Sequence, residues 1–420
     1  MSFMLFFVPL PPVQQKYSSL YLFFKMGQLQ ERYKKYREPQ KFIEAGVYPY
    51  FRAITSKQGT EVEMDGHKVL MFGSNAYTGL TGDPRVIEAA KQALDKYGSG
   101  CAGSRFLNGT LDLHVQLEKE LAEFVRKDDT LCFSTGFSVN QGVLAMVVGR
   151  GDYIICDDRD HASIVDGRRL SFAKQLHYKH NDMEDLESIL KTLPEDAVKL
   201  IVVDGVFSME GDLAKLPEIV KLKHKYNCSV MVDEAHGIGV FGKQGRGVCD
   251  HFGLTDDVDL IMGTFSKSLA SIGGFIASDA DTINFLRHTC RSYIFSASNT
   301  PAATAAALEA LHILENEPER IDNLWKVTRY ALNRFREEGF EIGETESPII
   351  PLYVHDVDKT FLVTKLAFDA GVFINPVIPP ACAPQDTLVR LALMATHTEE
   401  QVERGVQILK KIFKQLGIIK

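Results

Sequence analysis

The stretch V-M-V-D-E-A-H-G at residues 230–237 ends a short apolar run with an acidic residue, Asp233. Continuous apolar runs of this length are typical of strands buried on both faces of a parallel sheet. Ligands of open α/β sheets bind outside the carboxyl ends of the strands, so we expect Asp233 to lie in a ligand site. Nucleotide-hydrolysing helicases carry similar letters, but they need a G-x-x-x-x-G-K-[ST] loop. The sequence contains no such loop.

The surrounding sequence alternates between apolar runs and segments with helical periodicity. The predicted strands are residues 130–133, 153–156, 199–203, 230–232, 260–262 and 275–277. One predicted helix begins with an N-cap and a proline at residues 83–84 and ends at Gly98. Strands that alternate with helices indicate a layered α/β domain with a mostly parallel sheet.

The sequence after Pro301 predicts a second, smaller α/β unit. It is helical to about Phe335, and shorter elements follow at residues 349–354, 361–370, 372–374 and 388–393, before a last helix from Thr398. We therefore divide the chain into an N-terminal segment (26–70), a large domain (71–305) and a small C-terminal domain (306–420).

The first 25 residues form a separate part of the sequence. Residues 1–12 and 19–24 are apolar, but both runs are shorter than the roughly 20 residues that span a membrane. The basic and small residues that flank a signal peptide are missing. We expect a disordered or spurious extension with the real start at Met26, and keep a peripheral membrane anchor as the alternative.

Composition excludes several classes of function. The net charge is −8 and both signs of charge are interspersed, whereas nucleic-acid binding needs a concentrated basic face. The seven cysteines are scattered without a C-x-x-C pair, so no disulfide framework or metal site is expected, and a cytoplasmic protein is predicted. The G-x-G-x-x-G at residues 98–103 follows a helix, although a dinucleotide fingerprint must follow a strand.

A lysine follows the strand next to the one that carries Asp233. The run G-T-F-S-K-S at residues 263–268 places Lys267 there, with hydroxyls at Thr264 and Ser266 that can bind a phosphate. A free lysine has a pKa of about 10.4. Burial beside a cationic ring lowers that pKa, which suits imine formation and later proton transfer.

Two more strand ends carry groups of the same kind. The turn S-T-G-F at residues 134–137 opens a helix, and glycine at a helix N-terminus leaves N–H groups free to bind an anion. Gly136 is therefore predicted to cradle a phosphate, with an ordinary strand-to-helix turn as the alternative. His161, near the end of another strand, can stack on a cofactor ring and contact a substrate carboxylate.

Together these strand ends predict pyridoxal 5′-phosphate (PLP) as the cofactor. Lys267 would hold it as a Schiff base, and Asp233 would keep its ring nitrogen protonated, which preserves the ring as an electron sink. The motifs, in this order, resemble the fold-type-I PLP enzymes and, among them, the α-oxoamine synthases, over residues 26–416. The resemblance is carried by residues 74–77, 103–105, 107–110, 133–137, 161–167, 207–212, 233–237 and 263–267.

Within that family the sequence is most similar to the soluble bacterial serine palmitoyltransferase branch. The discriminating segments are residues 263–268, 290–298 and 379–381. Two positions depart from the pattern. Ala270 stands where a glycine is often found after the lysine, and Gln385-Asp386 follow Pro384 where Ala-Gly is common.

The resemblance implies a role for each matching residue. His236 would bond the ring hydroxyl, and His161 would stack on the ring and hold the amino-acid carboxylate. Arg390 would grip a carboxylate, with a structural salt bridge as its alternative. The remaining roles are phosphate binding by Gly136, Phe137, Thr264 and Ser266, support of the ring oxygen by Ser208, a place at the substrate mouth for Asn75, and, for Ser296 and Ser298, a contribution to the site of the second chain of a homodimer.

The resemblance also implies the reaction. It is the decarboxylating condensation of L-serine with a long-chain acyl-CoA, palmitoyl-CoA, to 3-ketosphinganine, which begins sphingolipid synthesis. The alternatives are a sister enzyme that uses glycine or alanine (2-amino-3-ketobutyrate CoA ligase or 8-amino-7-oxononanoate synthase), an aminotransferase, and a non-catalytic subunit. The sequence leaves the length and branching of the acyl chain open.

Overall fold

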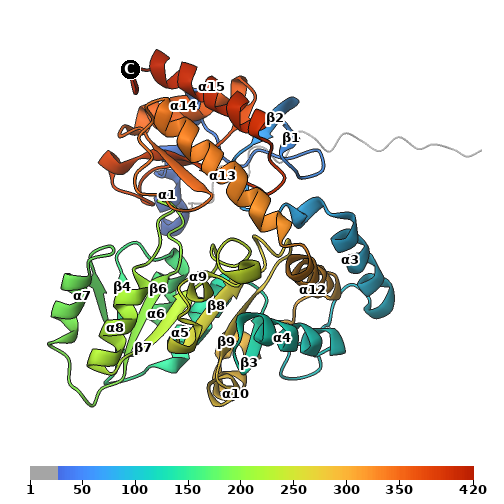
Figure 1. Ribbon diagram of the computed structural model, residues 1–420, viewed down its shortest axis with the longest axis vertical. Coiled ribbons are helices and arrows are strands. Elements are labelled where there is room, and N and C mark those ends of the chain that lie inside the picture. Colours follow the sequence, from blue (N-terminus) through green and yellow to red (C-terminus); the bar gives the residue numbers. More distant parts are fainter. Residues whose placement is uncertain (1–26) are drawn as a thin grey trace, which may run out of the picture. The chain divides into compact units, whose positions relative to one another are not determined.

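The structure, a computed structural model, describes residues 27–420 (Figure 1). The predictions for residues 1–25 lie outside this range. The described chain forms two compact units, residues 27–48 and residues 49–420. The first unit holds two short helices, α1 (Gln28–Lys34) and α2 (Glu38–Glu44). Among the described helices, none is both long enough and apolar enough to cross a membrane.

A seven-stranded sheet is the centre of the second unit. Its strands are β3 (Asp129–Phe133), β4 (Tyr153–Asp157), β5 (Lys174–Tyr178), β6 (Lys199–Asp204), β7 (Ser229–Asp233), β8 (Leu260–Thr264) and β9 (Gly274–Ser278). The order is β3-β9-β8-β7-β6-β4-β5. All neighbours from β8 to β5 are parallel, and β9 is antiparallel to both β8 and β3. The prediction of a mostly parallel α/β sheet is confirmed.

Helices cover both faces of this sheet (Figure 1). One face packs against α5 (Gly136–Val147), α6 (Ala162–Leu170), α10 (Ala280–Thr289) and α11 (Arg291–Ile294). The other face packs against α4 (Asp112–Val125), α7 (Met183–Leu190), α8 (Leu216–Tyr226) and α12 (Pro301–Asn316). Short helical segments connect these elements: η1 (Leu80–Gly82), η2 (Lys243–Gly245), α9 (Val248–His251) and η3 (Thr255–Asp257). Because successive strand residues point to opposite faces, continuous apolar runs such as β6 fill both cores.

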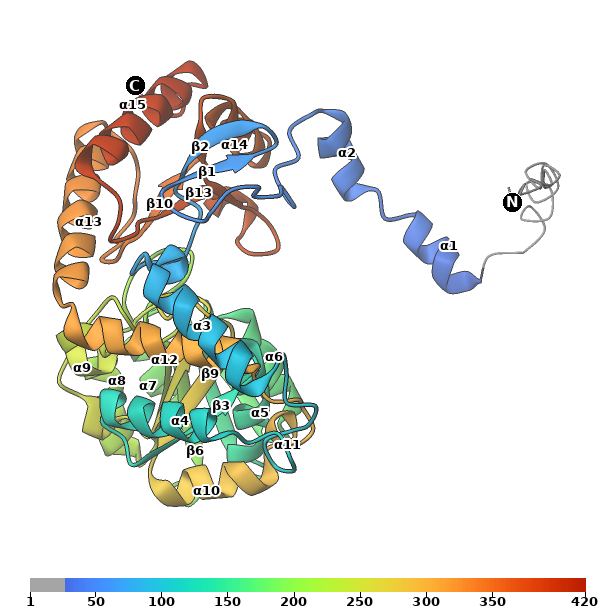
Figure 2. The ribbon, with the colours of Figure 1, turned by 90° about the vertical axis from the view of Figure 1, so that its right-hand side faces the viewer.

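The signals that predicted helices in the sequence are found at helices in the structure. Helix α3 (Pro84–Tyr97) begins at its N-cap Asp83, whose carboxylate accepts a hydrogen bond of 3.0 Å from the backbone N–H of Arg85. It ends at Gly98 and packs against α12 (Figure 2). The region predicted to be helical, from Pro301 to about Phe335, is confirmed and consists of two helices. The stretch breaks at Pro318, which has no N–H for a helical hydrogen bond, and α13 (Glu319–Glu337) begins after it.

The C-terminal part builds two small sheets. Strands β10 (Ile349–Tyr353), β13 (Leu388–Ala392) and β12 (Asn375–Val377) form an antiparallel sheet, with η4 (Pro384–Asp386) before β13. Helices α14 (Val357–Asp369) and α15 (Glu399–Gln415) accompany it. The hairpin β1 (Glu61–Met64) and β2 (His67–Met71) joins β11 (Val372–Phe373), so residues from both ends of this unit share a sheet. The domain boundaries after residues 70 and 305 stay predictions.

Candidate active site

A cavity of about 360 Å³ lies at the carboxyl ends of the parallel strands. Three of these strands end in residues that line it: β6 in Asp204, β7 in Asp233 and β8 in Thr264. Eight of the predicted site residues meet in its wall: Gly136, Phe137, His161, Asp233, His236, Thr264, Ser266 and Lys267. The structure therefore gathers at one edge of the sheet the groups that the sequence places at separate strand ends.

Asp233 is buried and held by fixed donors. Its Oδ2 accepts a hydrogen bond of 2.7 Å from the side-chain amide of Asn140, and its Oδ1 accepts one of 2.9 Å from the N–H of Ala235. Asn140 uses the same amide nitrogen to donate to Ser163 Oγ at 2.8 Å. Asn140, from the otherwise apolar face of α5, was not predicted. A polar residue inside an apolar helical pattern was its only signal in the sequence.

His161 continues this chain of contacts. Its Nδ1 lies 2.7 Å from Ser163 Oγ and accepts a hydrogen bond of 3.2 Å from the Ser163 N–H. Burial lowers the pKa of His161 below its ordinary value, although the charge of Asp233 opposes the change. The neutral ring then carries its proton on Nε2, because Nδ1 accepts the backbone hydrogen bond. His161 can therefore donate from Nε2 to an anion in the cavity.

Lys267 lies three residues after the end of β8 and is half-buried. Burial lowers its pKa to about 8, and the nearby carboxylates of Asp233 and Asp204 oppose that change. About a tenth of such a lysine is neutral at pH 7, compared with less than about a thousandth of a free lysine. Asp204 was not predicted. It accepts a hydrogen bond of 3.1 Å from the N–H of His161, and burial raises its own pKa well above the usual range.

The turn at Gly136 forms one end of the cavity. Gly136 is the first residue of α5, and the N-cap Thr135 accepts a hydrogen bond of 3.1 Å from the Ser138 N–H. The hydroxyls of Thr264 and Ser266 are 2.9 Å apart beside this helix end. A Cβ on Gly136 would lie 2.8 Å from Thr264 Oγ1, so only glycine leaves the space open. A helix N-terminus with two hydroxyls is a suitable site for a phosphate.

A second set of contacts connects the cavity to β13. His236 Nδ1 lies 2.7 Å from the hydroxyl of Tyr77. The guanidinium of Arg390 donates to that hydroxyl at 3.4 Å, to Asn75 Oδ1 at 3.0 Å and to the Ser208 carbonyl at 2.6 Å. Burial lowers the pKa of His236 well below its ordinary value. Tyr77 belongs to a segment that carried the family resemblance, but no role was predicted for it.

Five predicted site residues lie outside the cavity wall. Asn75 and Arg390 contact each other as described, and Ser208 lines a neighbouring cavity of about 570 Å³ that also includes His161. Ser298 donates from its backbone N–H to the Gly103 carbonyl at 3.0 Å. Neither Ser298 nor Ser296 lines the first cavity. The roles given to all these residues stay predictions.

The sequence matches the family of aminotransferases class I and II over residues 67–409. The chain belongs to this family. Within it, the predicted resemblance to the α-oxoamine synthases and their serine palmitoyltransferase branch is confirmed, as is the fold-type-I architecture.

Three known proteins match the chain over nearly its whole length. A serine palmitoyltransferase of Bacteroides ovatus is 76% identical over 94% of this chain and 100% of its own. An 8-amino-7-oxononanoate synthase of Thermosipho melanesiensis is 42% identical over 91% of this chain and 98% of its own. A solved serine palmitoyltransferase from S. paucimobilis, with a PLP–myriocin aldimine bound, is 35% identical with a TM-score of 0.91. That similarity covers 94% of this chain and 100% of the solved one.

The residues of this aminotransferase-family site fit PLP. The N-terminus of α5 and the hydroxyls of Thr264 and Ser266 suit its phosphate, and the missing Cβ of Gly136 leaves the space for it. The buried carboxylate of Asp233 suits a protonated ring nitrogen, and the lowered pKa of Lys267 suits a covalent bond to an aldehyde.

Proposed function

We propose that the protein is a PLP-dependent acyltransferase that condenses L-serine with a long-chain acyl-CoA, palmitoyl-CoA, to 3-ketosphinganine, CoA and carbon dioxide. This reaction is the first step of sphingolipid synthesis. One observation carries the proposal. Lys267, Asp233 and His161 meet in one cavity of a chain that is 76% identical to a serine palmitoyltransferase over nearly its whole length.

Binding of the amino acid falls to His161 and Arg390. The Nε2–H of His161 is free to donate to the serine carboxylate, because Nδ1 is occupied by Ser163. The guanidinium of Arg390 is held between Ser208, Asn75 and Tyr77 and offers the fork geometry that suits a carboxylate. Fixing the carboxylate also fixes the Cα–H bond, and such orientation lowers the barrier to proton removal.

Lys267 moves the proton at Cα. With a pKa of about 8 its amine is partly neutral at neutral pH and can accept that proton. PLP, when bound, supplies an electron sink for the negative charge that develops at Cα. The fixed carboxylate of Asp233 would hold the ring nitrogen protonated. Deprotonated Cα attacks the thioester carbonyl, and CoA leaves as its thiolate, which takes a proton from solvent. The carboxylate then leaves as carbon dioxide, and Lys267 returns the proton it accepted to Cα.

We also propose that the active form is a homodimer and that it works in the cytoplasm. Ser298 and Ser296 lie outside the cavity of their own chain, which is compatible with a contribution to the site of a partner chain. Phe295 beside them is 74% exposed, and a large exposed aromatic side chain is suited to an interface. All seven cysteines of the chain are free thiols, as in proteins of a reducing compartment.

Amino-acid choice is the point at which the proposal can be tested. L-serine, glycine and L-alanine are added separately to the PLP-loaded enzyme, the visible absorbance of the cofactor is followed, and the products formed with palmitoyl-CoA are identified by mass spectrometry. We expect condensation with serine and little with the other two. Condensation with alanine instead would favour an 8-amino-7-oxononanoate synthase, a name carried by relatives near 42% identity. Lys267→Ala is the inactive control.

A further inference from the structure

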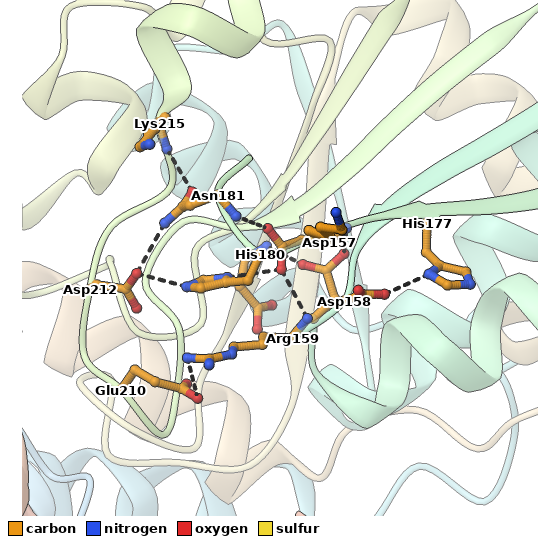
Figure 3. A network of polar contacts seen from close by, with 12 residues as sticks. Asp157, Asp158, Arg159, His177, His180, Asn181, Glu210, Asp212 and Lys215 are labelled. Carbon is orange, nitrogen blue, oxygen red and sulfur yellow. Dashed lines mark hydrogen bonds and ion pairs between the residues drawn. The ribbon is translucent and has the colours of Figure 1, made fainter. Parts of the chain in front are cut away.

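A polar network beside the active site is centred on His180, in the loop between β5 and α7 (Figure 3). Its Nδ1 lies 2.9 Å from Asp157 Oδ1, and its Nε2 lies 2.9 Å from Asp212 Oδ2. The next residue, Asn181, reinforces both contacts. Its backbone N–H donates to Asp157 Oδ2 at 2.8 Å, and its side-chain amide donates to Asp212 Oδ2 at 3.0 Å.

The geometry requires both ring nitrogens of His180 to carry protons. Each nitrogen faces a carboxylate, and an ionised carboxylate only accepts hydrogen bonds. A neutral imidazole has one N–H, so one of its nitrogens would direct a lone pair at a carboxylate oxygen. The ring of Phe207 packs nearly perpendicular to that of His180, with the two ring centroids 4.4 Å apart. The two carboxylates therefore hold His180 as an imidazolium.

On one side this contact reaches His161. Asp157 is the last residue of β4, and its carboxylate also accepts from the N–H of Arg159 at 2.9 Å. The buried Asp160 accepts from the N–H groups of Asp157 at 3.0 Å and Asp204 at 2.9 Å. Asp204 in turn accepts from the N–H of His161. The turn at residues 157–161 is thus fixed at both ends. Asp157 fixes it where it leaves β4, and the hydrogen bond to Asp204 fixes it at His161, beside the cavity.

On the other side, the contact of His180 with Asp212 reaches Arg390. Asp212 closes a tight turn in which the Phe207 N–H donates to the Asp212 carbonyl at 3.0 Å and the Gly211 N–H donates to the Phe207 carbonyl at 2.9 Å. Ser208 lies in this turn, and its carbonyl accepts the hydrogen bond from Arg390 Nε. The position of this turn therefore fixes one of the three contacts that hold the guanidinium.

We propose that His180 is a positioning residue of the active site. It joins the turn that carries His161 to the turn that holds Arg390, and so sets the relative position of the two groups assigned to the substrate carboxylate. This inference rests on the proposed function for the roles of His161 and Arg390, whereas the double contact of His180 itself rests only on the structure.

The surroundings of His180 give the proposal a pH dependence. Burial opposes its charge, but Asp157 and Asp212 raise its pKa to about 9. Glu210 on the same turn pairs with Arg159 at 3.0 Å, and buried Asp160 lies beyond Asp157. The contact of His180 with both carboxylates needs the charged imidazolium. The positioning of His161 and Arg390 is therefore intact below neutral pH and is lost as the pH rises through about 9.

The test compares His180→Gln with His177→Gln in the PLP-loaded enzyme. Glutamine at 180 has both of its N–H donors on one nitrogen and carries no charge, so it cannot place a donor at each of the two positions that Nδ1 and Nε2 occupy. His177 lies three residues earlier, pairs with Asp158 at 2.6 Å and is largely exposed, so it is the matched control. We expect His180→Gln to lower kcat roughly 10–100-fold at full PLP content, as for a shift of about 1 Å in the reacting groups. His177→Gln should stay within about twofold of wild type.

A second variant, Asp212→Asn, covers the case in which His180→Gln does not fold. It removes one of the two charges that hold the His180 proton, so the alkaline loss of activity should begin at a lower pH than in wild type. Unchanged kcat per PLP-loaded site in His180→Gln, even with a lowered melting temperature, would overturn the proposal. An unmoved pH profile in Asp212→Asn would do the same. If wild type uses an amino acid other than serine, the proposed function fails and these measurements are made with that amino acid.

Discussion

At the scale of single residues, Ala270 is a departure from the family pattern that the structure explains. Its φ is +51°, in the left-handed region, which is unfavourable for every residue except glycine by roughly 1–2 kcal/mol. Glycine is therefore the residue that this backbone favours three positions after Lys267. The alanine at this position therefore carries backbone strain.

We predict that Ala270→Gly stabilises the protein. Relief of strain outweighs the larger entropy of glycine in the unfolded chain, which leaves a gain of about 0.5–1 kcal/mol. Thermal unfolding of the PLP-loaded protein should show a melting temperature higher by about 1–2 °C. The control is Ala90→Gly in the middle of α3, where the same change should destabilise by about 1 kcal/mol. Equal effects of the two changes would contradict this explanation.

Some residues of the site could be predicted from the sequence, and others could not. Asp233 and Lys267 could be predicted, because Asp233 ends an apolar run, Lys267 lies in the short segment after another, and the ends of parallel strands meet. Asp204 ends an apolar run in the same way and carries the same signal, although it was not predicted. Asn140 and Tyr77 carry no such signal, because they act through hydrogen bonds to residues far away in the sequence, and no local spacing reports such pairs.

At the scale of elements, every strand of the seven-stranded sheet except β5 agrees with the predictions to within one or two residues at each end. The missed strands are those with polar or irregular composition. Edge strand β5 has the sequence K-Q-L-H-Y and is largely exposed, β1 and β2 form a short hairpin with charged residues, and β12 contains a proline. Only strands buried on both faces carry the continuous apolar signal.

The N-terminus of α5 allows a test of the phosphate assignment. Gly136→Ala would place a Cβ 2.8 Å from Thr264 Oγ1 and within 3.1 Å of a Met262 methyl group, in the part of the cavity assigned to the phosphate. We expect PLP to bind at least about 10-fold more weakly, because one lost charge-assisted hydrogen bond contributes about 1.5–3 kcal/mol. Gly149→Ala, just beyond the end of the same helix, meets nothing within 4 Å and should leave PLP affinity unchanged. Equal affinities would exclude this helix end as the phosphate site.

At the scale of the whole unit of residues 49–420, the two ends of the sequence meet at the active site. Asn75 and Tyr77 follow the N-terminal hairpin, Ser208 follows β6, and Arg390 lies in the centre of β13. The guanidinium of Arg390 contacts all three through different nitrogens. A substitution of Arg390 that removes the guanidinium fork and keeps the positive charge therefore separates a packing role of this residue from a role in substrate binding.

We predict that Arg390→Lys raises the KM for serine about 10–100-fold, because an ammonium replaces a fork of donors and loses charge-assisted hydrogen bonds of about 1.5–3 kcal/mol. PLP content should stay full, since Arg390 is not in the wall of the cofactor cavity. Arg404→Lys is the control: its partner is Glu61, and the arginine side chain is 50% exposed, so serine KM should change less than twofold. Steady-state kinetics with serine varied at saturating palmitoyl-CoA, beside the absorbance of bound PLP, measures both quantities. If Arg390→Lys lost PLP or stability while serine KM stayed constant, Arg390 would be a structural link between the ends of the chain and the substrate carboxylate would need another partner.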